Sequence, residues 1–226
     1  LPARRGAGGV HGGALNEGLP LMPGPRVAVL DYGIGNLRSA QKALVRAGAD
    51  AVLTDDSATA DSADAVVLPG VGAFGACMDA LRTSGLEPCV RRAVDDGRPF
   101  LGICVGMQML FGSSDEDPGH AGLGVIPGRV RWIPDGVPRP QMQWNNLSVH
   151  TDEPMFAGLG DSPWMYFVHS LHGVPDDPAD VVATVRYGGE VNAAFRRDNV
   201  FAVQFHPEKS AAAGLRLLAN FVTSAA

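Results

Sequence analysis

The sequence has few cysteines, no excess of positive charge and no long apolar run, and each absence excludes a class of protein. Three cysteines occur in 226 residues, an odd number without the C-x-x-C pairing of metal or redox motifs. The formal net charge of −6 at pH 7 argues against a nucleic-acid-binding surface. No apolar run is long enough to span a bilayer. We therefore expect no metal, nucleic acid or membrane partner, and a reducing, cytosolic setting.

The first 25 residues differ in composition from the rest of the chain. Glycine and proline dominate residues 1–25, no hydrophobic period appears, and the continuous apolar centre of a signal peptide is missing. We expect a flexible leader or an expression remnant there, followed by a single domain at residues 26–226. Apolar residues make up 46% of the sequence, which suits one α/β domain of this size.

The first half of the domain alternates strand and helix patterns. Apolar, β-branched runs predict three buried strands, at residues 26–33, 64–70 and 98–103. A helical period runs from Asn36 to Gly48, and a helical stretch at 78–96 is broken near Gly85 and Pro88. Strands that alternate with helices in this way predict βαβ units and a mostly parallel sheet flanked by helices.

The second half reads as short strands with turns between them. Strand-like runs lie at 128–134, 145–150, 164–170, 181–188 and 199–208. The stretch 191–205 predicts a hairpin around Asp198 and Asn199. A final helix is expected at about 210–224, with one apolar side formed by Leu215, Leu218, Ala219 and Val222. This half therefore predicts an antiparallel extension of the parallel sheet.

The stretch PFLGICVGMQML (99–110) places Cys104 between two glycines at the end of a predicted strand. Sites in parallel α/β sheets lie at the carboxyl ends of strands, and the flanking Gly102 and Gly106 let neighbouring backbone pass close by. This is the logic of a nucleophile elbow with sulfur in place of oxygen. The following helix N-terminus would favour the thiolate, and the Val105 N–H would face an oxyanion. A small buried cysteine in a core turn explains the motif equally well.

The stretch QFHPEKS (204–210) offers a base for that thiol. In extended backbone His206 and Glu208 would point to the same face, so that the carboxylate holds one imidazole nitrogen while the other faces the sulfur. Pro207 between them suits a strand end or edge. A turn of this kind by itself is more often structural than catalytic. Because it occurs here together with the cysteine turn, a catalytic role is favoured.

A glycine-rich turn at 67–75, VLPGVGAFG, lacks the lysine of a phosphate loop and the dinucleotide fingerprint. We expect the turn instead to supply a second oxyanion donor, the backbone N–H of Val71 or of Gly72. We expect Cys77 and Cys89 to be packing residues on the helical stretch that follows. His120, His150 and His172 are not spaced as metal ligands are, and we expect them at the surface or in loops.

Three motifs in this order, LPGVGAFG, GICVGMQML and QFHPEKS, resemble the class I (triad) glutamine amidotransferases. DYGIGNLRSA (31–40) and YFVHS (166–170) narrow the resemblance to the glutaminase subunits of imidazole glycerol phosphate synthases. The resemblance covers about residues 26–224. It implies a flavodoxin-like, class I amidotransferase-type α/β fold with a mostly parallel sheet and no cofactor.

The resemblance also implies the roles of individual residues. Cys104 would form a glutamyl thioester and release ammonia, His206 would move the proton, and Glu208 would orient the imidazole. Val105 and the segment 69–72 would supply the oxyanion hole. The segment would need a peptide rearrangement before its donor points inward, so we expect the hole not to be formed in the isolated subunit. The bound glutamine would be surrounded by Gly72, Gln108, His169 and Ser170.

A partner subunit is implied in the same way. In this family ammonia crosses to a (β/α)₈-barrel cyclase subunit in a heterodimer, which makes imidazole glycerol phosphate and an aminoimidazole carboxamide ribotide in histidine biosynthesis. The expected docking residues are Asn36, Trp144, Asn145 and Lys209. Two departures from the family pattern occur, Gln143 in the expected partner loop PQMQWNNL (140–147) and Leu171 in place of a tyrosine after YFVHS.

Three alternatives remain beside this interpretation. A cysteine α/β-hydrolase would place its acid before the histidine, whereas here the order is nucleophile, histidine, glutamate. Another class I amidotransferase would share the triad but not DYGIGN and YFVHS. A scaffold without activity is disfavoured because Cys104, His206 and Glu208 are all present.

Overall fold

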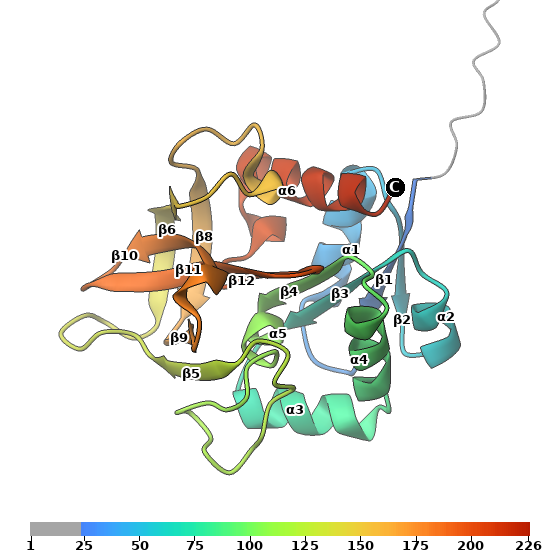
Figure 1. Cartoon of the computed structure of the whole chain (residues 1–226), viewed down its shortest axis with the longest axis horizontal. Coiled ribbons are helices and arrows are strands. Elements are labelled where there is room, and N and C mark those ends of the chain that lie inside the picture. Colours follow the sequence, from blue (N-terminus) through green and yellow to red (C-terminus); the bar gives the residue numbers. More distant parts are fainter. Residues whose placement is uncertain (1–23) are drawn as a thin grey trace, which may run out of the picture.

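The structure, a computed structural model, describes residues 24–226. The expected leader at 1–25 therefore lies, apart from its last two residues, outside the described part. An eight-stranded sheet in the order β2-β1-β3-β4-β12-β11-β10-β7 forms the centre of the molecule (Figure 1). Its parallel part consists of β1 (Arg26–Leu30), β2 (Asp50–Thr54), β3 (Ala65–Gly70), β4 (Phe100–Cys104) and β12 (Val200–Val203).

The other strands are antiparallel, as the second half of the sequence predicts. The sheet continues through β11 (Glu190–Arg197), β10 (Val181–Arg186) and β7 (Ser148–Val149). Two separate pairs are β5 (Gly128–Trp132) with β9 (Leu171–Pro175), and β6 (Gln141–Asn146) with β8 (Trp164–His169). The predicted fold class is therefore confirmed, including the β11–β12 hairpin.

Helices cover both faces of the parallel strands. They are α1 (Leu37–Arg46), α2 (Ser57–Asp61), α3 (Phe74–Thr83), α4 (Glu87–Asp95), α5 (Val105–Gln108) and α6 (Ala211–Ser224), with 3-10 turns η1 (Pro154–Phe156), η2 (Pro178–Asp180) and η3 (Pro207–Lys209). Figure 1 shows α1 and α6 on one side of the sheet and α3 and α4 on the other. No helix within residues 24–226 is long and apolar enough to cross a membrane.

The interrupted helical stretch is confirmed as two helices. Gly85 has a φ of 75° and follows Ser84, the last cap residue of α3, and Pro88 occupies the first turn of α4. A positive φ is accessible to glycine without the clash that a Cβ would cause, and a first-turn proline loses no helical hydrogen bond. All residues of β3 and β4 are buried, which explains their continuous apolar runs.

Four details of the sequence interpretation are corrected by the structure. β2 and α2 are not predicted, because each has only five residues and a weak apolar pattern. The expected partner loop 140–147 is mostly strand β6, since it pairs in register with β8. The buried side of α6 is formed by Gly214, Leu217, Leu218, Phe221 and Val222. It is rotated from the predicted stripe because α6 packs against α1 and the turn η3.

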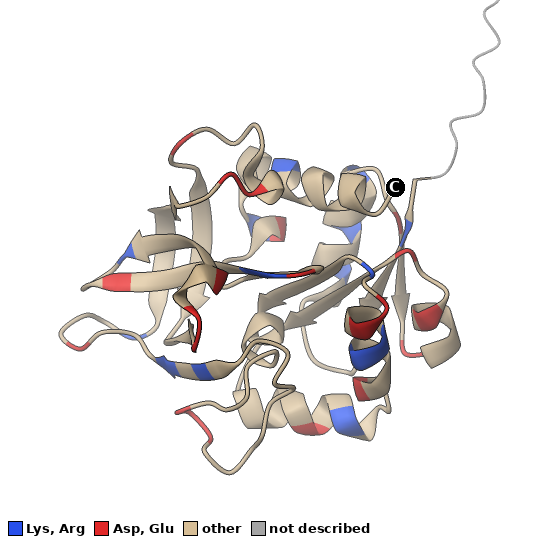
Figure 2. Ribbon diagram, in the orientation of Figure 1, with Lys and Arg blue, Asp and Glu red and all other residues tan. Residues whose placement is uncertain are grey.

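Charged side chains of both signs are dispersed over the described surface. Figure 2 shows Lys and Arg mixed with Asp and Glu on helices and strands, without a basic stripe. Several opposite charges are paired, such as Arg92 with Asp61 and Arg197 with Asp180.

The register of the sheet decides where the site lies. β3 and β4 are parallel neighbours in which Gly70 pairs with Cys104. β4 and β12 are also parallel, with Ile103 opposite Val203. Because parallel strands end at the same edge, the segments that follow β3, β4 and β12 lie side by side.

Candidate active site

Cys104 occupies a strained turn between β4 and α5. Its φ is 56° and its ψ is −115°, a conformation that costs a non-glycine residue roughly 1–3 kcal/mol and is concentrated at functional sites. A Cβ at Gly106 would overlap the carbonyl oxygen of Leu68, and one at Gly102 would lie 3.0 Å from the Met107 Cα. Both glycines are therefore needed for the close approach of backbone, as the sequence predicts.

His206 and Glu208 form a buried pair beside this turn. The distance from His206 Nδ1 to Glu208 Oε1 is 2.9 Å, and the two side chains are 5% and 4% exposed. The expected extended backbone is wrong, because β12 ends at Val203 and residues 207–209 form the 3-10 turn η3. Pro207 starts that turn, and its fixed φ suits the first helical position.

The surroundings of His206 favour the imidazolium. Burial alone would lower the pKa of His206, but its interactions with the Cys104 sulfur and the Glu208 carboxylate outweigh burial and raise the pKa well above its usual value. A proton held on this ring can be given to a leaving group and taken back. The pair therefore has the properties of a general acid and base with an orienting carboxylate.

A cavity of about 380 Å³ contains both of these groups. It is lined by Cys104 and His206 together with Val71, Gly72, Val105, Gln108, Glu116, Pro140, Val168, His169, Ser170, Leu171 and Lys209. All residues expected in the triad, oxyanion hole and glutamine site line this cavity, apart from Glu208, which lies behind His206. The size suits an amino-acid side chain and backbone.

Two of the expected glutamine-binding residues are held by protein contacts. Gln108 is 3% exposed and its Nε2 donates to Gln204 Oε1 at 3.1 Å. His169 Nδ1 lies 2.7 Å from the Leu171 carbonyl, and its Nε2 lies 3.0 Å from the Gln141 side-chain amide. Because both ring nitrogens of His169 are engaged, only the backbone of residues 168–170 is available to bind a ligand here.

The tautomer of His169 follows from these contacts. Burial lowers its pKa to about 4, so the ring is neutral near pH 7 and carries one N–H. A carbonyl only accepts, which puts the proton on Nδ1 and makes Nε2 an acceptor. The Gln141 amide then satisfies both groups by turning its Nε2, which is buried without a partner, toward the ring.

Sequence reasoning missed Gln204 as a residue of the site. It is fully buried at the end of β12, and its Nε2 lies 3.8 Å from the Cys104 sulfur. Through Oε1 it also accepts from Gln108. The signal available in the sequence is a polar residue directly after an apolar strand and before the His206 turn.

Glu116 was also missed. It lines the cavity from the segment after α5, and its Oε2 accepts a 2.8 Å hydrogen bond from the Phe74 N–H at the start of α3. A carboxylate at this position can pair with the α-ammonium group of an amino acid. No pattern in the sequence distinguishes it from the neighbouring acidic residues of a surface loop.

The expected docking residues do not all have the same exposure. Asn36 precedes α1 and Lys209 is the last residue of the turn η3, and both are exposed. Trp144 on β6 is 44% exposed and packs edge-on against Tyr166 at 5.9 Å. Asn145 is buried, and its Nδ2 donates to the Arg186 carbonyl.

The two departures from the family pattern have different positions. Leu171 lines the cavity, but its contacts with His169 and Gln108 are made by the backbone carbonyl, which any side chain would preserve. Gln143 is exposed on β6, opposite Phe167 on β8, and is not among the residues that line the cavity.

Two of the remaining histidines, His120 and His172, have partners within the protein. His120 lies 3.1 Å from Asp79 and 2.9 Å from Asp117 at the surface, as expected. His172 differs from the expectation, because it lies in strand β9 and its Nδ1 accepts from the Asn192 N–H. Within residues 24–226 no cluster of three or more acidic, histidine or cysteine side chains is arranged to hold a metal ion.

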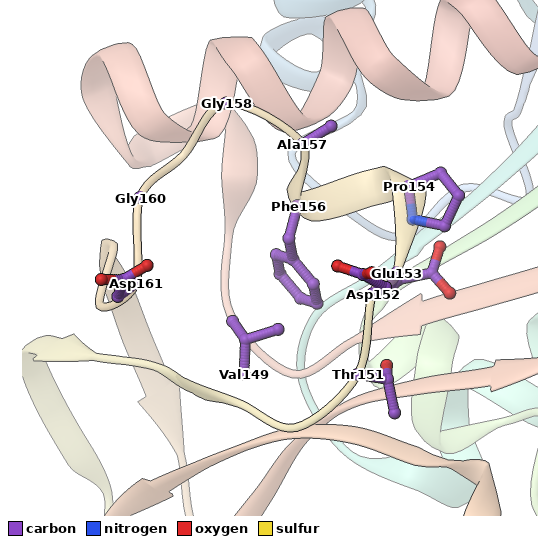
Figure 3. A pocket seen from close by; sticks show the side chains of 10 residues that line it. All are labelled: Val149, Thr151, Asp152, Glu153, Pro154, Phe156, Ala157, Gly158, Gly160 and Asp161. Atoms are coloured by element: carbon purple, nitrogen blue, oxygen red, sulfur yellow. The ribbon is translucent and has the colours of Figure 1, made fainter.

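A larger cavity, of about 530 Å³, lies away from Cys104. Figure 3 shows Asp161 on one side of it and Asp152 and Glu153 on the other, with Phe156 between them. Glu153 is engaged with the Met155 N–H and with Arg196. Its lining includes no cysteine or histidine, so its size does not make it the site of the thiol chemistry.

Comparisons with known proteins agree with the geometry of the smaller cavity. A family model described as glutamine amidotransferase class-I matches residues 28–225. The imidazole glycerol phosphate synthase subunit HisH of Synechococcus elongatus is 51% identical over 206 residues, which cover 89% of this chain and 94% of the relative. The protein of the same name from Salinibacter ruber is 50% identical over 200 residues, which cover 85% and 92%.

Solved structures agree as well. A structure described as a crystal structure of glutamine amidotransferase has a TM-score of 0.70 at 26% identity and covers 88% of this chain and 98% of its own. The similarity spans almost the whole described domain and is not confined to the motifs.

Proposed function

The chain belongs to the class-I glutamine amidotransferase family, and on that premise we propose that it is the glutaminase subunit of an imidazole glycerol phosphate synthase, which acts in histidine biosynthesis. The observation that carries the proposal is Cys104, held at an unusual backbone conformation in one cavity with the buried His206–Glu208 pair. The substrate is glutamine, hydrolysed to glutamate and ammonia.

The first half of the reaction forms a thioester. The Cys104 sulfur attacks the side-chain carboxamide carbon of glutamine, and the carbonyl oxygen becomes an oxyanion. The N–H of Val105, which has no intrahelical acceptor in the first turn of α5, is one donor to it. As the C–N bond breaks, His206 donates its proton to the departing nitrogen, and ammonia leaves.

The second half restores the enzyme. A water molecule loses a proton to His206 and attacks the thioester carbon, and the C–S bond breaks. Glutamate leaves, and the freed Cys104 sulfur again lies beside a protonated His206. Glu208 holds the ring so that the same nitrogen serves both steps. Glu116 and the backbone of residues 168–170 bind the α-amino and α-carboxylate ends of the substrate, which keeps the amide carbon over the sulfur.

The ammonia needs an acceptor in the same assembly. Free ammonia at neutral pH is mostly protonated and unreactive as a nucleophile, so release into water would waste glutamine. The relatives are named as subunits of a synthase, which supports a cyclase partner. We infer a (β/α)₈-barrel cyclase in a heterodimer, docked through the exposed side chains of Asn36, Trp144 and Lys209, with Asn145 supporting strand β6 from inside.

Glutamate release from glutamine tests this function. The chain should release glutamate when mixed with a barrel cyclase and its nucleotide ligand, and Cys104→Ala should abolish release, a loss of on the order of 10⁴-fold or more for a missing nucleophile. Cys89→Ala is the matched control, since Cys89 is also fully buried but lies on α4 away from the cavity.

Other results would point elsewhere. High activity of the chain alone, without response to the cyclase, would identify an independent glutaminase. No activity in either condition would favour a scaffold and overturn the proposal.

A further inference from the structure

Gln204 follows strand β12 directly and is fully buried. β4 and β12 are parallel neighbours in which Ile103 pairs with Val203, so the next residue in each segment, Cys104 and Gln204, lies at the same edge of the sheet. There the Gln204 Nε2 is 3.8 Å from the Cys104 sulfur. The register of the sheet therefore brings a buried amide against the nucleophile.

The neighbours of Gln204 determine which of its amide atoms faces the sulfur. The Leu171 carbonyl can only accept, so the Gln108 amide turns its nitrogen toward it, at 3.5 Å. The same nitrogen lies 3.1 Å from the Gln204 amide, which must present its oxygen there. The nitrogen of Gln204 is left for the sulfur. Turning either amide, or both, would bring two nitrogens or two oxygens into contact.

Two other groups lie against the sulfur. The Val168 carbonyl oxygen of β8 is 4.0 Å away, and its partial negative charge disfavours a thiolate. Burial lowers the pKa of His206, but the sulfur and the Glu208 carboxylate raise it above its usual value, so this ring is positive near pH 7. The Gln204 N–H adds a neutral donor that offsets the Val168 carbonyl.

Other titratable groups lie around the cysteine. They are Glu116, Lys209 and His169, which line the cavity, and Tyr32 and Cys77, which lie close to Cys104. Burial lowers the pKa of the His169 imidazole and raises those of the Tyr32 phenol and the Cys77 thiol, so all three are uncharged near pH 7. Glu116 and Lys209 have opposite charges, whose effects on the sulfur oppose each other.

An N–H on the sulfur matters at two moments of the reaction. The sulfur is negative before it attacks the amide carbon, and again when the C–S bond of the thioester breaks and the electron pair returns to it. Hydrogen bonds to a charged partner are shorter and stronger than neutral ones, and burial strengthens them further. We propose that Gln204 is a catalytic residue whose side-chain N–H stabilises the Cys104 thiolate at both moments. The second moment rests on the proposed glutaminase function.

Alkylation of Cys104 by iodoacetamide tests the first moment without any substrate. The thiolate attacks the reagent carbon and iodide leaves, so the rate follows the thiolate fraction. Gln204→Met keeps a side chain of similar volume and removes the N–H. The pH midpoint of alkylation should rise by about one unit, which is tenfold less thiolate below both midpoints. The Cys104 peptide is followed by mass spectrometry in the complex of the chain with a barrel cyclase.

The alkylation rate at high pH separates a chemical role from a structural one. When all of the thiol is ionised, the rate depends on access to the sulfur and on its intrinsic nucleophilicity. It should be unchanged or slightly higher in Gln204→Met, because a less stabilised thiolate is the better nucleophile. A displaced Cys104 would instead lower this limiting rate and leave the midpoint in place.

Gln141→Met is the matched control. Gln141 is also a fully buried glutamine, but it contacts the imidazole of His169 rather than the sulfur. Its loss should leave the alkylation midpoint at the wild-type value.

Turnover should respond as well. In Gln204→Met, kcat for glutamate release by the complex with its nucleotide ligand should fall several-fold, since the smaller thiolate fraction is partly offset by greater nucleophilicity. KM should rise, because Gln108 loses the Gln204 oxygen that accepts from it.

A measurement on the wild-type chain tests the same contact without relying on a folded variant. The side-chain N–H resonances of Gln204, followed by heteronuclear NMR, should shift with pH at the alkylation midpoint. They should lose this shift in Cys104→Ala, which has no thiol to titrate.

Two results are decisive in different ways. A wild-type alkylation midpoint in Gln204→Met, or amide resonances that ignore the charge on Cys104, would refute the role of Gln204 and leave the glutaminase function standing. A shifted midpoint without any glutamate release by the wild-type complex would support the contact of Gln204 with the thiolate and refute the proposed function.

Discussion

At the scale of single residues, the chemistry depends on a few strained or buried groups. Cys104 has a positive φ, which residues other than glycine usually avoid. Backbone packing around Gly102 and Gly106 holds this conformation. His206 and Glu208 are almost inaccessible to water. Electrostatic interactions between them are therefore stronger than at the surface. A mutation that removes the Glu208 charge should change the pKa of His206.

Glu208→Gln should lower kcat and shift its pH dependence. The carboxylate helps to raise the pKa of His206, so its loss moves this pKa down and the alkaline limb of the kcat profile to lower pH. The rate at the optimum should fall by at least about 10²-fold, because the ring loses its orienting partner. Glutamate release measured between pH 6 and 10 checks both effects.

Glu153→Gln is the matched control for this variant. Its side chain is also 5% exposed, but it lies at the larger cavity away from Cys104. It should leave the pH profile unchanged. A wild-type alkaline limb in Glu208→Gln would mean that the carboxylate does not set the pKa of His206.

At the scale of elements, helix α6 supports the turn that carries the base. The side chain of Ser210 at its start does not cap the helix. Its hydroxyl donates to the His206 carbonyl and accepts from the Tyr166 N–H of β8. Gly214, one turn later, lies against the Pro207 carbonyl, where a Cβ would overlap it. The position of His206 therefore depends on how closely α6 approaches the turn η3.

Gly214→Ala should move α6 away from η3 and lower both stability and kcat. Overpacking against backbone typically costs 1–3 kcal/mol, so we expect a loss of roughly that size in the free energy of unfolding. The accompanying displacement of His206 should lower kcat several-fold. Urea unfolding and glutamate release measure the two effects.

Gly97→Ala separates these two effects. Gly97 has a φ of 74° after α4 with open space around it, so alanine there strains the backbone by about 1–2 kcal/mol without touching the site. It should lose stability with kcat intact. Equal kcat in Gly214→Ala and in the wild type would show that the turn η3 tolerates movement of α6.

At the scale of the whole molecule, two neutral histidines, the buried His169 and the half-buried His172, couple stability to pH. Burial lowers the pKa of His169 and of His172 to about 4. The unfolded chain, with an ordinary histidine pKa near 6.5, binds protons before the folded one does. The stability that these residues contribute is therefore complete above about pH 6.5 and is lost as the pH falls toward 4.

His172→Asn should make unfolding less dependent on pH in this window. Asparagine keeps an acceptor for the Asn192 N–H, which now bonds to His172 Nδ1, but it cannot take up a proton. The free energy of unfolding measured by urea between pH 4.5 and 7.5 should show a shallower slope than that of the wild type. His150→Asn, at an exposed residue, should retain the wild-type slope, and equal slopes for all three proteins would contradict the assignment.

The sequence by itself predicted the alternation of strands and helices and the sheet class. It also named most of the residues that line the cavity around Cys104. These features depend on local patterns: apolar runs for β3 and β4, and glycines on both sides of Cys104. The pairing of His206 with Glu208 was also predicted, although its backbone was not. A two-residue spacing brings the side chains together in a 3-10 turn as well as in a strand.

Only the tertiary structure decided which residues from distant segments meet at Cys104. Gln204 and Glu116 reach the cavity through sheet register and loop packing. Tyr32, in the segment after β1, and Cys77, on α3, contact the carbonyls of Pro69 and Val71. The buried side of α6 and the pairing of β6 with β8 were likewise decided only by the tertiary structure. Each of these features depends on contacts between residues far apart in the chain, and local periodicity contains no information about which distant partner will be adjacent.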